Sequence, residues 1–359
     1  MVSPYTPTGY RMIRSIDIRH FRCYRTLALN VPSRLNVIVG DNGVGKTALL
    51  EAIFFALANG SELAVRYRQV RGFDGVFSGT ARRIEDAIWG DYFTDRDTSK
   101  PVSIALNGDG PENRSLVIAR GGSDALILYD ASGSSDIANG SISLTWTDSE
   151  GLPHSIYPKA SAKGIDLPST NEDLPDFFNL GAGVAVGAGE IASRFSDISV
   201  AGRRQEFVEE FCKEFSMIKD LNIEITGGSP VIFATLKNNR RVPLPSLSFG
   251  INKMIGVLGC IASRPRSVLT IDEVEIGIHY SHLRGVWSSI LHFMRRYDSQ
   301  IFVSTHSAEC LSALIEAAAD KIDDISIWRI ERDEKDEPVI RQFNGSDVKL
   351  ALDYDEEVR

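Results

Sequence analysis

A glycine-rich run between an apolar segment and a helix-like segment constrains this sequence more than any other feature. The run, Gly40-Asp-Asn-Gly-Val-Gly-Lys-Thr47, fits the pattern G-x-x-x-x-G-K-[ST] in full. It follows a largely apolar run at 34–39 and opens a segment, 46–58, that is rich in Ala, Leu and Phe at helical spacing. A strand, a glycine-rich turn and a helix in this order bind phosphate with backbone N–H groups. The sequence therefore predicts an α/β fold with a phosphate-binding loop (P-loop).

The loop supplies candidate ligands for ATP and Mg²⁺. Glycines allow the backbone N–H groups to turn toward phosphate oxygens. We expect Lys46 to contact the β- and γ-phosphates and the Thr47 hydroxyl to bind Mg²⁺. The candidate nucleotide-binding residues of the loop are Asn42, Gly43, Gly45, Lys46 and Thr47.

Two further apolar runs end in polar residues. Residues 267–271 precede Asp272 and Glu273, and a later run leads into Ser-Thr-His306-Ser. Ionised acids at the end of a buried strand cost free energy unless a cation or a water molecule uses them. We therefore expect Asp272 to hold Mg²⁺ and Glu273 to polarise the attacking water, with Glu275 as the alternative base. His306 is expected to reach the γ-phosphate.

The order of elements predicts the organisation of the chain. Residues 101–158 contain short strand-like segments separated by Gly, Asn, Asp and Ser, which indicates an antiparallel β subdomain. From residue 247 onward, apolar strands alternate with helices, as in a parallel sheet. We predict an N-terminal ATPase lobe at 1–60, an inserted region at 61–189 and a C-terminal ATPase lobe at 190–359. The two flanking lobes are expected to build the nucleotide-binding sheet.

Composition and charge argue against a nucleic-acid coat protein, a membrane protein and a zinc protein. A formal net charge of −9 argues against a generally basic nucleic-acid coat. No apolar run approaches the roughly 18 residues that cross a bilayer, and the first ten residues lack the apolar core of a signal peptide. We expect a cytoplasmic protein that does not enter membranes. The four cysteines are widely separated, which favours reduced thiols over a zinc site.

Together these motifs resemble the ABC-type ATPases of the SMC and RecF class, and more narrowly the ATPase portion of the OLD (overcoming lysogenisation defect) group. Residues 16–26 (IDIRHFRCYRT) resemble the opening strand of that class. Residues 245–253 (PSLSFGINK) look like its signature loop, and 271–279 (IDEVEIGIH) like its Walker B segment and D-loop. Ser-Thr-His306-Ser looks like its switch histidine. The resemblance covers roughly residues 12–58 and 190–359.

The resemblance implies a homodimer that encloses two ATP molecules. Each ATP would lie between one P-loop and the signature loop of the other copy, where Ser248 and Gly250 approach the γ-phosphate. Two departures from the family pattern stand out. Phe249 replaces the first glycine of the usual Leu-Ser-Gly-Gly loop, and neither Gln69 nor Gln205 lies in a recognisable Q-loop.

OLD proteins carry a Toprim nuclease domain after the ATPase. Only about 50 residues follow His306 here, which is short for a domain. Asp353-Tyr-Asp355 matches an Asp-x-Asp pair, but we interpret it as an acidic tail. We therefore expect an ATPase that is not a nuclease by itself.

Three roles remain open for such an ATPase. The first is control of a separate protein effector, a nuclease or toxin encoded nearby, in an anti-phage defence module. The second is DNA repair or maintenance like that of RecF, with arginines between residues 66 and 71 and at Arg203 and Arg204 contacting phosphates. The third is a scaffold that binds ATP and barely turns it over. A contact surface for a partner is expected between residues 62 and 189.

Overall fold

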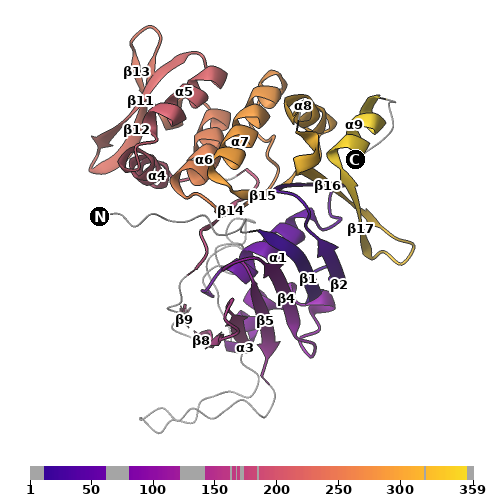
Figure 1. Ribbon diagram of the computed structural model, residues 1–359. Helices are drawn as coiled ribbons and strands as arrows, with labels where there is room; N and C mark the ends of the chain where they lie inside the picture. The colour runs from indigo at the N-terminus through magenta and orange to yellow at the C-terminus, as the bar shows by residue number, and fades with distance from the viewer. Residues whose placement is uncertain are drawn as a thin grey trace. The chain divides into compact units, whose positions relative to one another are not determined.

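The computed structural model describes residues 12–61, 81–121, 142–161, 164–166, 168–169, 174–183, 186–318 and 321–353. The chain forms two compact units, each assembled from separated stretches of sequence. Unit 1 comprises Met1–Val31, Glu51–Pro175 and Arg332–Pro338, and unit 2 comprises Pro32–Leu50, Asp176–Glu331 and Val339–Arg359. Each unit is built on its own six-stranded sheet (Figure 1).

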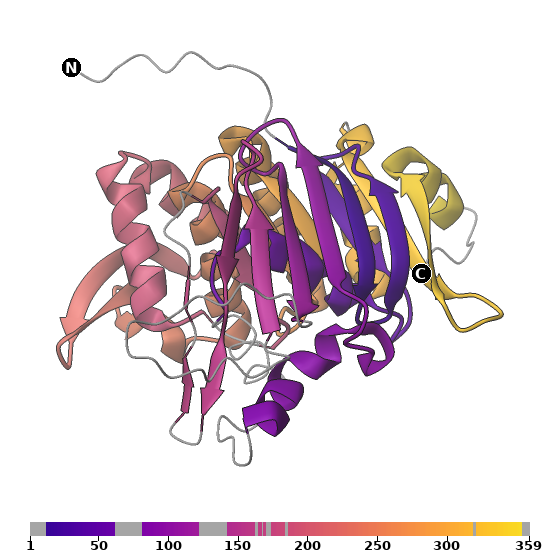
Figure 2. The same ribbon diagram turned by 90° about the horizontal axis from the view of Figure 1, so that it is seen from below.

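The sheet of unit 1 is antiparallel, with the strand order β2-β1-β4-β5-β6-β7. Figure 2 shows these strands side by side. Burial alternates along β4, β5 and β6, so one face of the sheet covers a core. The strands are β1 Ile13–Phe21, β2 Tyr24–Asn30, β4 Val102–Gly108, β5 Arg114–Arg120, β6 Ile142–Thr147 and β7 Pro153–Ile156.

Aromatic side chains fill the core of unit 1. Trp146 of β6 is fully buried, and its indole N–H donates to the backbone oxygen of Phe55 at 2.9 Å. The Phe55 ring packs edge-on against Tyr92, with 5.1 Å between ring centroids. The remaining elements of this unit are α3 Ala81–Trp89, the 3-10 helices Gly90–Tyr92 and Thr94–Arg96, and the strand pair β8 Lys159–Ser161 and β9 Gly164–Asp166. Helix α1, Lys46–Leu57, contributes residues to both units.

The sheet of unit 2 has the strand order β10-β14-β15-β3-β16-β17. The pairs β10/β14, β14/β15, β15/β3 and β3/β16 are parallel. Strands β3, β14 and β15 are buried at every position, as expected where helices cover both faces. The strands are β3 Leu35–Val39, β10 Phe177–Leu180, β14 Val268–Ile271, β15 Gln300–Ser304, β16 Ile325–Arg332 and β17 Pro338–Asn344.

Helices and a smaller sheet complete unit 2. The helices are α4 Ala188–Val200, α5 Arg204–Glu214, α6 Phe249–Ser263, α7 Leu283–Tyr297, α8 Ala308–Ala318 and α9 Gly345–Asp353. Short 3-10 helices span Leu244–Ser246, Tyr280–His282 and Ile322–Asp324. The three-stranded antiparallel sheet consists of β11 Ile218–Thr226, β12 Ser229–Leu236 and β13 Arg241–Pro243, and it lies beside α4 and α5 (Figure 1).

The predicted alternation of strands and helices is confirmed, because α6, β14, α7, β15 and α8 begin and end close to the expected residues. The predicted antiparallel β subdomain is confirmed as well. A strand expected at 125–129 lies outside the described residues.

The compact units do not follow the expected boundaries at residues 60 and 189. Strands β1 and β2, expected in the nucleotide-binding lobe, belong instead to the antiparallel sheet, where β2 pairs with β1 and β1 pairs with β4. The inserted region contributes one strand to the parallel sheet, because β10 pairs with β14. Alternation within a strand shows that one of its faces is buried, but it does not show which sheet the strand joins.

Candidate nucleotide-binding site

The glycine-rich loop follows β3 and leads into α1 within unit 2. Gly40 has a φ of 137°, and a Cβ at this position would lie 2.3 Å from the backbone oxygen of Ile330. Both the backbone angle and the close approach therefore require glycine. Gly43 and Gly45 also have positive φ, at 80° and 121°. The local sequence thus forms the tight turn that was predicted, with Asn42 and Gly43 exposed on it.

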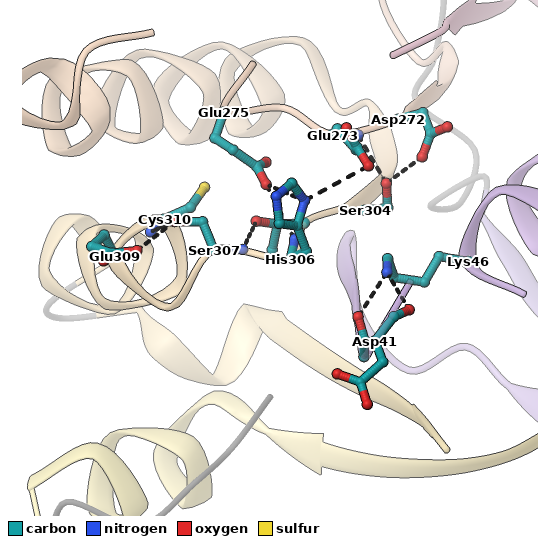
Figure 3. Close-up of polar contacts among 12 residues, drawn as sticks. Asp41, Lys46, Asp272, Glu273, Glu275, Ser304, His306, Ser307, Glu309 and Cys310 are labelled. Atoms are coloured by element: carbon teal, nitrogen blue, oxygen red, sulfur yellow. Dashed lines mark hydrogen bonds and ion pairs between the residues drawn. The ribbon is translucent and has the colours of Figure 1, made fainter. Parts of the chain in front are cut away.

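Lys46 begins α1 and folds back over the loop (Figure 3). Its ammonium donates to the backbone oxygens of Gly40 at 2.7 Å and Asp41 at 2.8 Å. Only 6% of the residue is exposed. Burial lowers the pKa of Lys46, and the carboxylates of Glu273 and Asp272 oppose that shift. The ammonium therefore lies inside the loop that was predicted to hold phosphates.

Asp272 links the loop to two neighbouring strands. Its Oδ2 accepts a hydrogen bond from the Thr47 hydroxyl at 2.9 Å, and its Oδ1 accepts one from the Ser304 hydroxyl at 2.5 Å. Asp272 follows β14 and Ser304 ends β15, and the carboxyl ends of parallel strands meet at one edge of a sheet. The Thr47 hydroxyl and the Asp272 carboxylate therefore place two oxygen atoms side by side. This donor set fits Mg²⁺, which takes one or two protein ligands and fills its other positions with water and phosphate.

The next residue, Glu273, has an unusual backbone. Its φ is 48°, which a residue with a side chain rarely adopts. Two side chains hold the peptide groups on either side of its Cα: the Glu273 N–H donates to the Ser304 hydroxyl at 2.8 Å, and the ammonium of Lys253 donates to the Glu273 backbone oxygen. The Glu273 side chain itself is 26% exposed, so its carboxylate is accessible to water.

His306 lies between two acids (Figure 3). Its Nδ1 is 3.2 Å from Oε1 of Glu275 and 3.7 Å from Oε1 of Glu273. The backbone N–H of His306 also donates to Glu275, at 3.1 Å. Glu275, considered only as an alternative base from the sequence, therefore holds His306 in the structure. The ring remains about half exposed.

Ser248 and Gly250 lie at the start of α6. Ser248 caps the helix, because its hydroxyl accepts a hydrogen bond from the N–H of Ile251 at 3.2 Å. Gly250 packs so closely that a Cβ would lie 2.3 Å from the backbone oxygen of Gly277. The Phe249 ring occupies the space that a side chain at position 277 would need. Among the described residues, Ser248, Phe249 and Gly250 contact α6 and the segment after β14 rather than the P-loop.

The structure brings Lys46, Thr47, Asp272, Glu273 and His306 into one cluster. Sequence reasoning missed two of its members. Ser304 could have been found, since it is the last residue of a predicted strand in the same motif as His306. Lys253 carries no signal except a charge within an otherwise apolar helix, and burial lowers its pKa to about 8.

Several other candidates lie elsewhere. Gln205 bonds with Glu209 along α5, which gives it no place in the cluster. Gln69, the arginines between residues 66 and 71, and Asp355 lie outside the described residues. None of the helices in the described part of the chain is long and apolar enough to cross a membrane.

Comparisons with known proteins agree with this geometry. A family model described as "AAA domain, putative AbiEii toxin, Type IV TA system" matches residues 35–312. An "ATP/GTP phosphatase" of Helicobacter pylori is 19% identical over 86% of this chain and 89% of its own length. A "DNA replication and repair protein RecF" of Idiomarina loihiensis is 33% identical, over 29% of each chain.

Among solved structures, an SMC head bound to the C-terminal winged-helix domain of ScpA has a TM-score of 0.52 at 12% identity. The match covers 94% of this chain and 99% of that one. An SMC head with an extended coiled coil, bound to the C-terminal domain of ScpA derived from Pyrococcus furiosus, has a TM-score of 0.50 at 10% identity. It covers 96% of this chain and 99% of that one. The predicted fold class, an α/β P-loop fold of the ABC-type head, is thereby confirmed.

Proposed function

Because the chain belongs to the family of AAA domains whose model it matches over residues 35–312, we propose that it binds ATP with Mg²⁺ and hydrolyses ATP. One observation carries the proposal. A continuous set of contacts runs from the Thr47 hydroxyl through Asp272 and Ser304 to the backbone of Glu273. It joins the phosphate-binding loop to an accessible carboxylate, the pair of groups that hydrolysis of a phosphate anhydride requires.

Each residue has a distinct task in this mechanism. Lys46 and the loop N–H groups bind the phosphates, and Thr47 and Asp272 would hold Mg²⁺, which would neutralise phosphate charge. Glu273 orients and polarises the attacking water. His306, held by Glu275, donates a hydrogen bond toward the γ-phosphate.

We infer further that the active form is a homodimer. Ser248 is exposed at the N-terminus of α6, where a helix attracts an anion, and Gly250 behind it is buried against Gly277. Their contacts are with α6 and Gly277 rather than with the P-loop of the same chain, so we assign them to the nucleotide of a second copy. A higher homo-oligomer would use the same contacts.

The biological role that we propose is control of a separate effector, as in OLD-like defence modules. The family description names a toxin, and the SMC heads that share the fold were solved with a second protein bound. The chain itself is not expected to cut nucleic acid. A RecF-like role on DNA has less support, because Arg203 and Arg204, its candidate contacts, bond within the chain to Ala262 and Asp220.

Replacement of Glu273 by Gln tests the activity. The change keeps the shape of the side chain and removes the carboxylate that polarises water, so ATP should still bind while hydrolysis falls by roughly a hundredfold or more. The variant should also accumulate as an ATP-bound dimer, visible by light scattering. Glu316→Gln, on the exposed surface of α8, is the matched control and should hydrolyse ATP at the wild-type rate. Wild-type turnover in Glu273→Gln would refute the assignment of Glu273.

A further inference from the structure

Glu273 is held by side chains from two different elements. Its N–H donates to Ser304, at the end of β15, and its backbone oxygen accepts a hydrogen bond from Lys253 on α6. The φ of 48° is unfavourable for glutamate and persists only where the surroundings impose it. The two hydrogen bonds restrain the peptide groups on either side of the Glu273 Cα. They therefore set the direction in which the Glu273 side chain projects from the backbone.

Lys253 is a costly residue at this position. It is 4% exposed and lies within α6, where the following residues Met254 and Ile255 are also buried. An ammonium loses hydration on burial unless hydrogen bonds and opposite charges compensate. The compensation comes from the Glu273 backbone oxygen and from the charges of nearby acids, with Glu275 the strongest. An apolar side chain of similar volume would avoid the cost, so packing does not account for the lysine.

The same helix contacts the segment after β14 at a second point. Gly250, in the first turn of α6, packs on the backbone oxygen of Gly277, and the Phe249 ring covers Gly277. Helix α6 thus joins two places: its own N-terminal turn, Ser248–Gly250, assigned above to the nucleotide of a second copy, and the backbone of Glu273.

We propose that Lys253 is a positioning residue, which fixes the Glu273 backbone and links it to the N-terminal turn of α6 at Ser248–Gly250. The inference rests on the proposed ATP hydrolysis, in which Glu273 polarises the water. Phosphate binding belongs to Lys46 and the P-loop, and Lys253 makes its hydrogen bond to protein backbone instead. Loss of Lys253 therefore slows hydrolysis much more than it weakens ATP binding.

The test compares Lys253→Met with the wild type. Methionine keeps the length of the side chain and removes the ammonium. We expect kcat to fall by roughly tenfold or more while the Kd for ATP changes by less than about threefold. Amide hydrogen exchange across residues 272–277, measured without nucleotide, should become faster in the variant. Lys253→Arg, which keeps the charge and the donors, should recover part of the lost kcat, and Met254→Leu is the control for repacking of α6.

The outcomes separate this inference from the proposed function. A wild type that hydrolyses ATP, together with a folded Lys253→Met of unchanged kcat and unchanged exchange, would overturn the role of Lys253 and leave the ATPase assignment intact. A wild type without turnover would overturn the ATPase assignment, and hydrogen exchange alone would then decide whether Lys253 holds Glu273. If thermal unfolding shows that Lys253→Met does not fold, Lys253→Gln, a neutral donor, takes its place with the same two readouts.

Discussion

The two six-stranded sheets of this protein bury their side chains in different ways. Along β6 of unit 1, buried and half-buried residues alternate, whereas every residue of β15 in unit 2 is buried. The antiparallel sheet has one covered face, and the parallel sheet is covered on both. The candidate site lies at the carboxyl ends of β3, β14 and β15, within the doubly covered sheet. The burial pattern along a strand therefore distinguishes the antiparallel sheet, which covers a core with one face, from the parallel sheet, which carries the candidate site.

Buried charge also differs between the two units. In unit 1, Arg22 pairs with Glu51 at 2.6 Å, and the guanidinium stacks over the ring of Tyr92. The charge of Arg22 is thus balanced by a protein carboxylate and covered by an aromatic ring. In unit 2, the buried ammonium groups of Lys46 and Lys253 lie in the field of several carboxylates. Such a surplus of acids suits a site that recruits a cation, whereas a matched pair suits a structural role.

The largest effects that test the difference in burial between the two sheets are changes in the free energy of unfolding. Phe302 and Val303 are adjacent in β15 and fully buried, so alanine at either position should lower the free energy of unfolding, by about 3–5 and about 2 kcal/mol respectively. In β6, Leu144→Ala should cost about 2–5 kcal/mol and the neighbouring Thr145→Ala less than about 1 kcal/mol. Urea unfolding measures all four. Equal losses at Leu144 and Thr145 would contradict the one-sided burial of β6.

A second effect concerns ATP affinity. Lys46→Ala removes the ammonium from the P-loop, and the Kd for a labelled ATP analogue should rise by roughly a hundredfold or more, equivalent to about 3 kcal/mol. Lys100→Ala removes a surface lysine of unit 1 that pairs with Asp97, and it should leave the Kd unchanged. An unaltered affinity in Lys46→Ala would rule out the P-loop as the ATP site.

A third, smaller effect concerns the serine between the two acids. Ser304→Ala leaves a buried oxygen of Asp272 and the N–H of Glu273 without this partner, so we expect kcat to fall by roughly tenfold and stability by about 1–3 kcal/mol. Ser143→Ala is the matched change in unit 1, where the hydroxyl donates to a strand carbonyl at 3.3 Å. It should cost less than about 1 kcal/mol. Similar losses in the two variants would mean that Ser304 is an ordinary strand residue.

The last effect depends on pH. Burial lowers the pKa of Lys253 to about 8 from the usual 10.5. Between these values the unfolded chain holds a proton that the folded chain has released, so this residue makes stability rise with pH. The stability of the wild type relative to Lys253→Met should therefore increase from pH 8 to 10.5, by at most about 1.4 kcal/mol per pH unit. Chemical unfolding at several pH values measures the slope, and a falling difference would have the wrong sign.

Much of the site could be predicted because its signals are short in sequence. The turn at Gly40–Thr47 is specified by glycines within the loop, and the acids at Asp272 and Glu273 directly follow the strand that presents them. His306 follows β15 in the same way. The hairpins of unit 1 were likewise readable from their turn residues.

Partnerships between distant residues were decided only by the tertiary structure. Ser304 reaches Asp272 across 32 positions and Lys253 reaches Glu273 across 20, so neither pair leaves a local pattern. The sequence alone determined the P-loop turn and the polar ends of buried strands, because backbone angles and side-chain alternation depend on near neighbours. Only the folded chain shows that β10 belongs to the parallel sheet and that β1 and β2 belong to the antiparallel one. Strand order depends on which apolar faces meet after the chain has collapsed, and many pairings satisfy the same alternation.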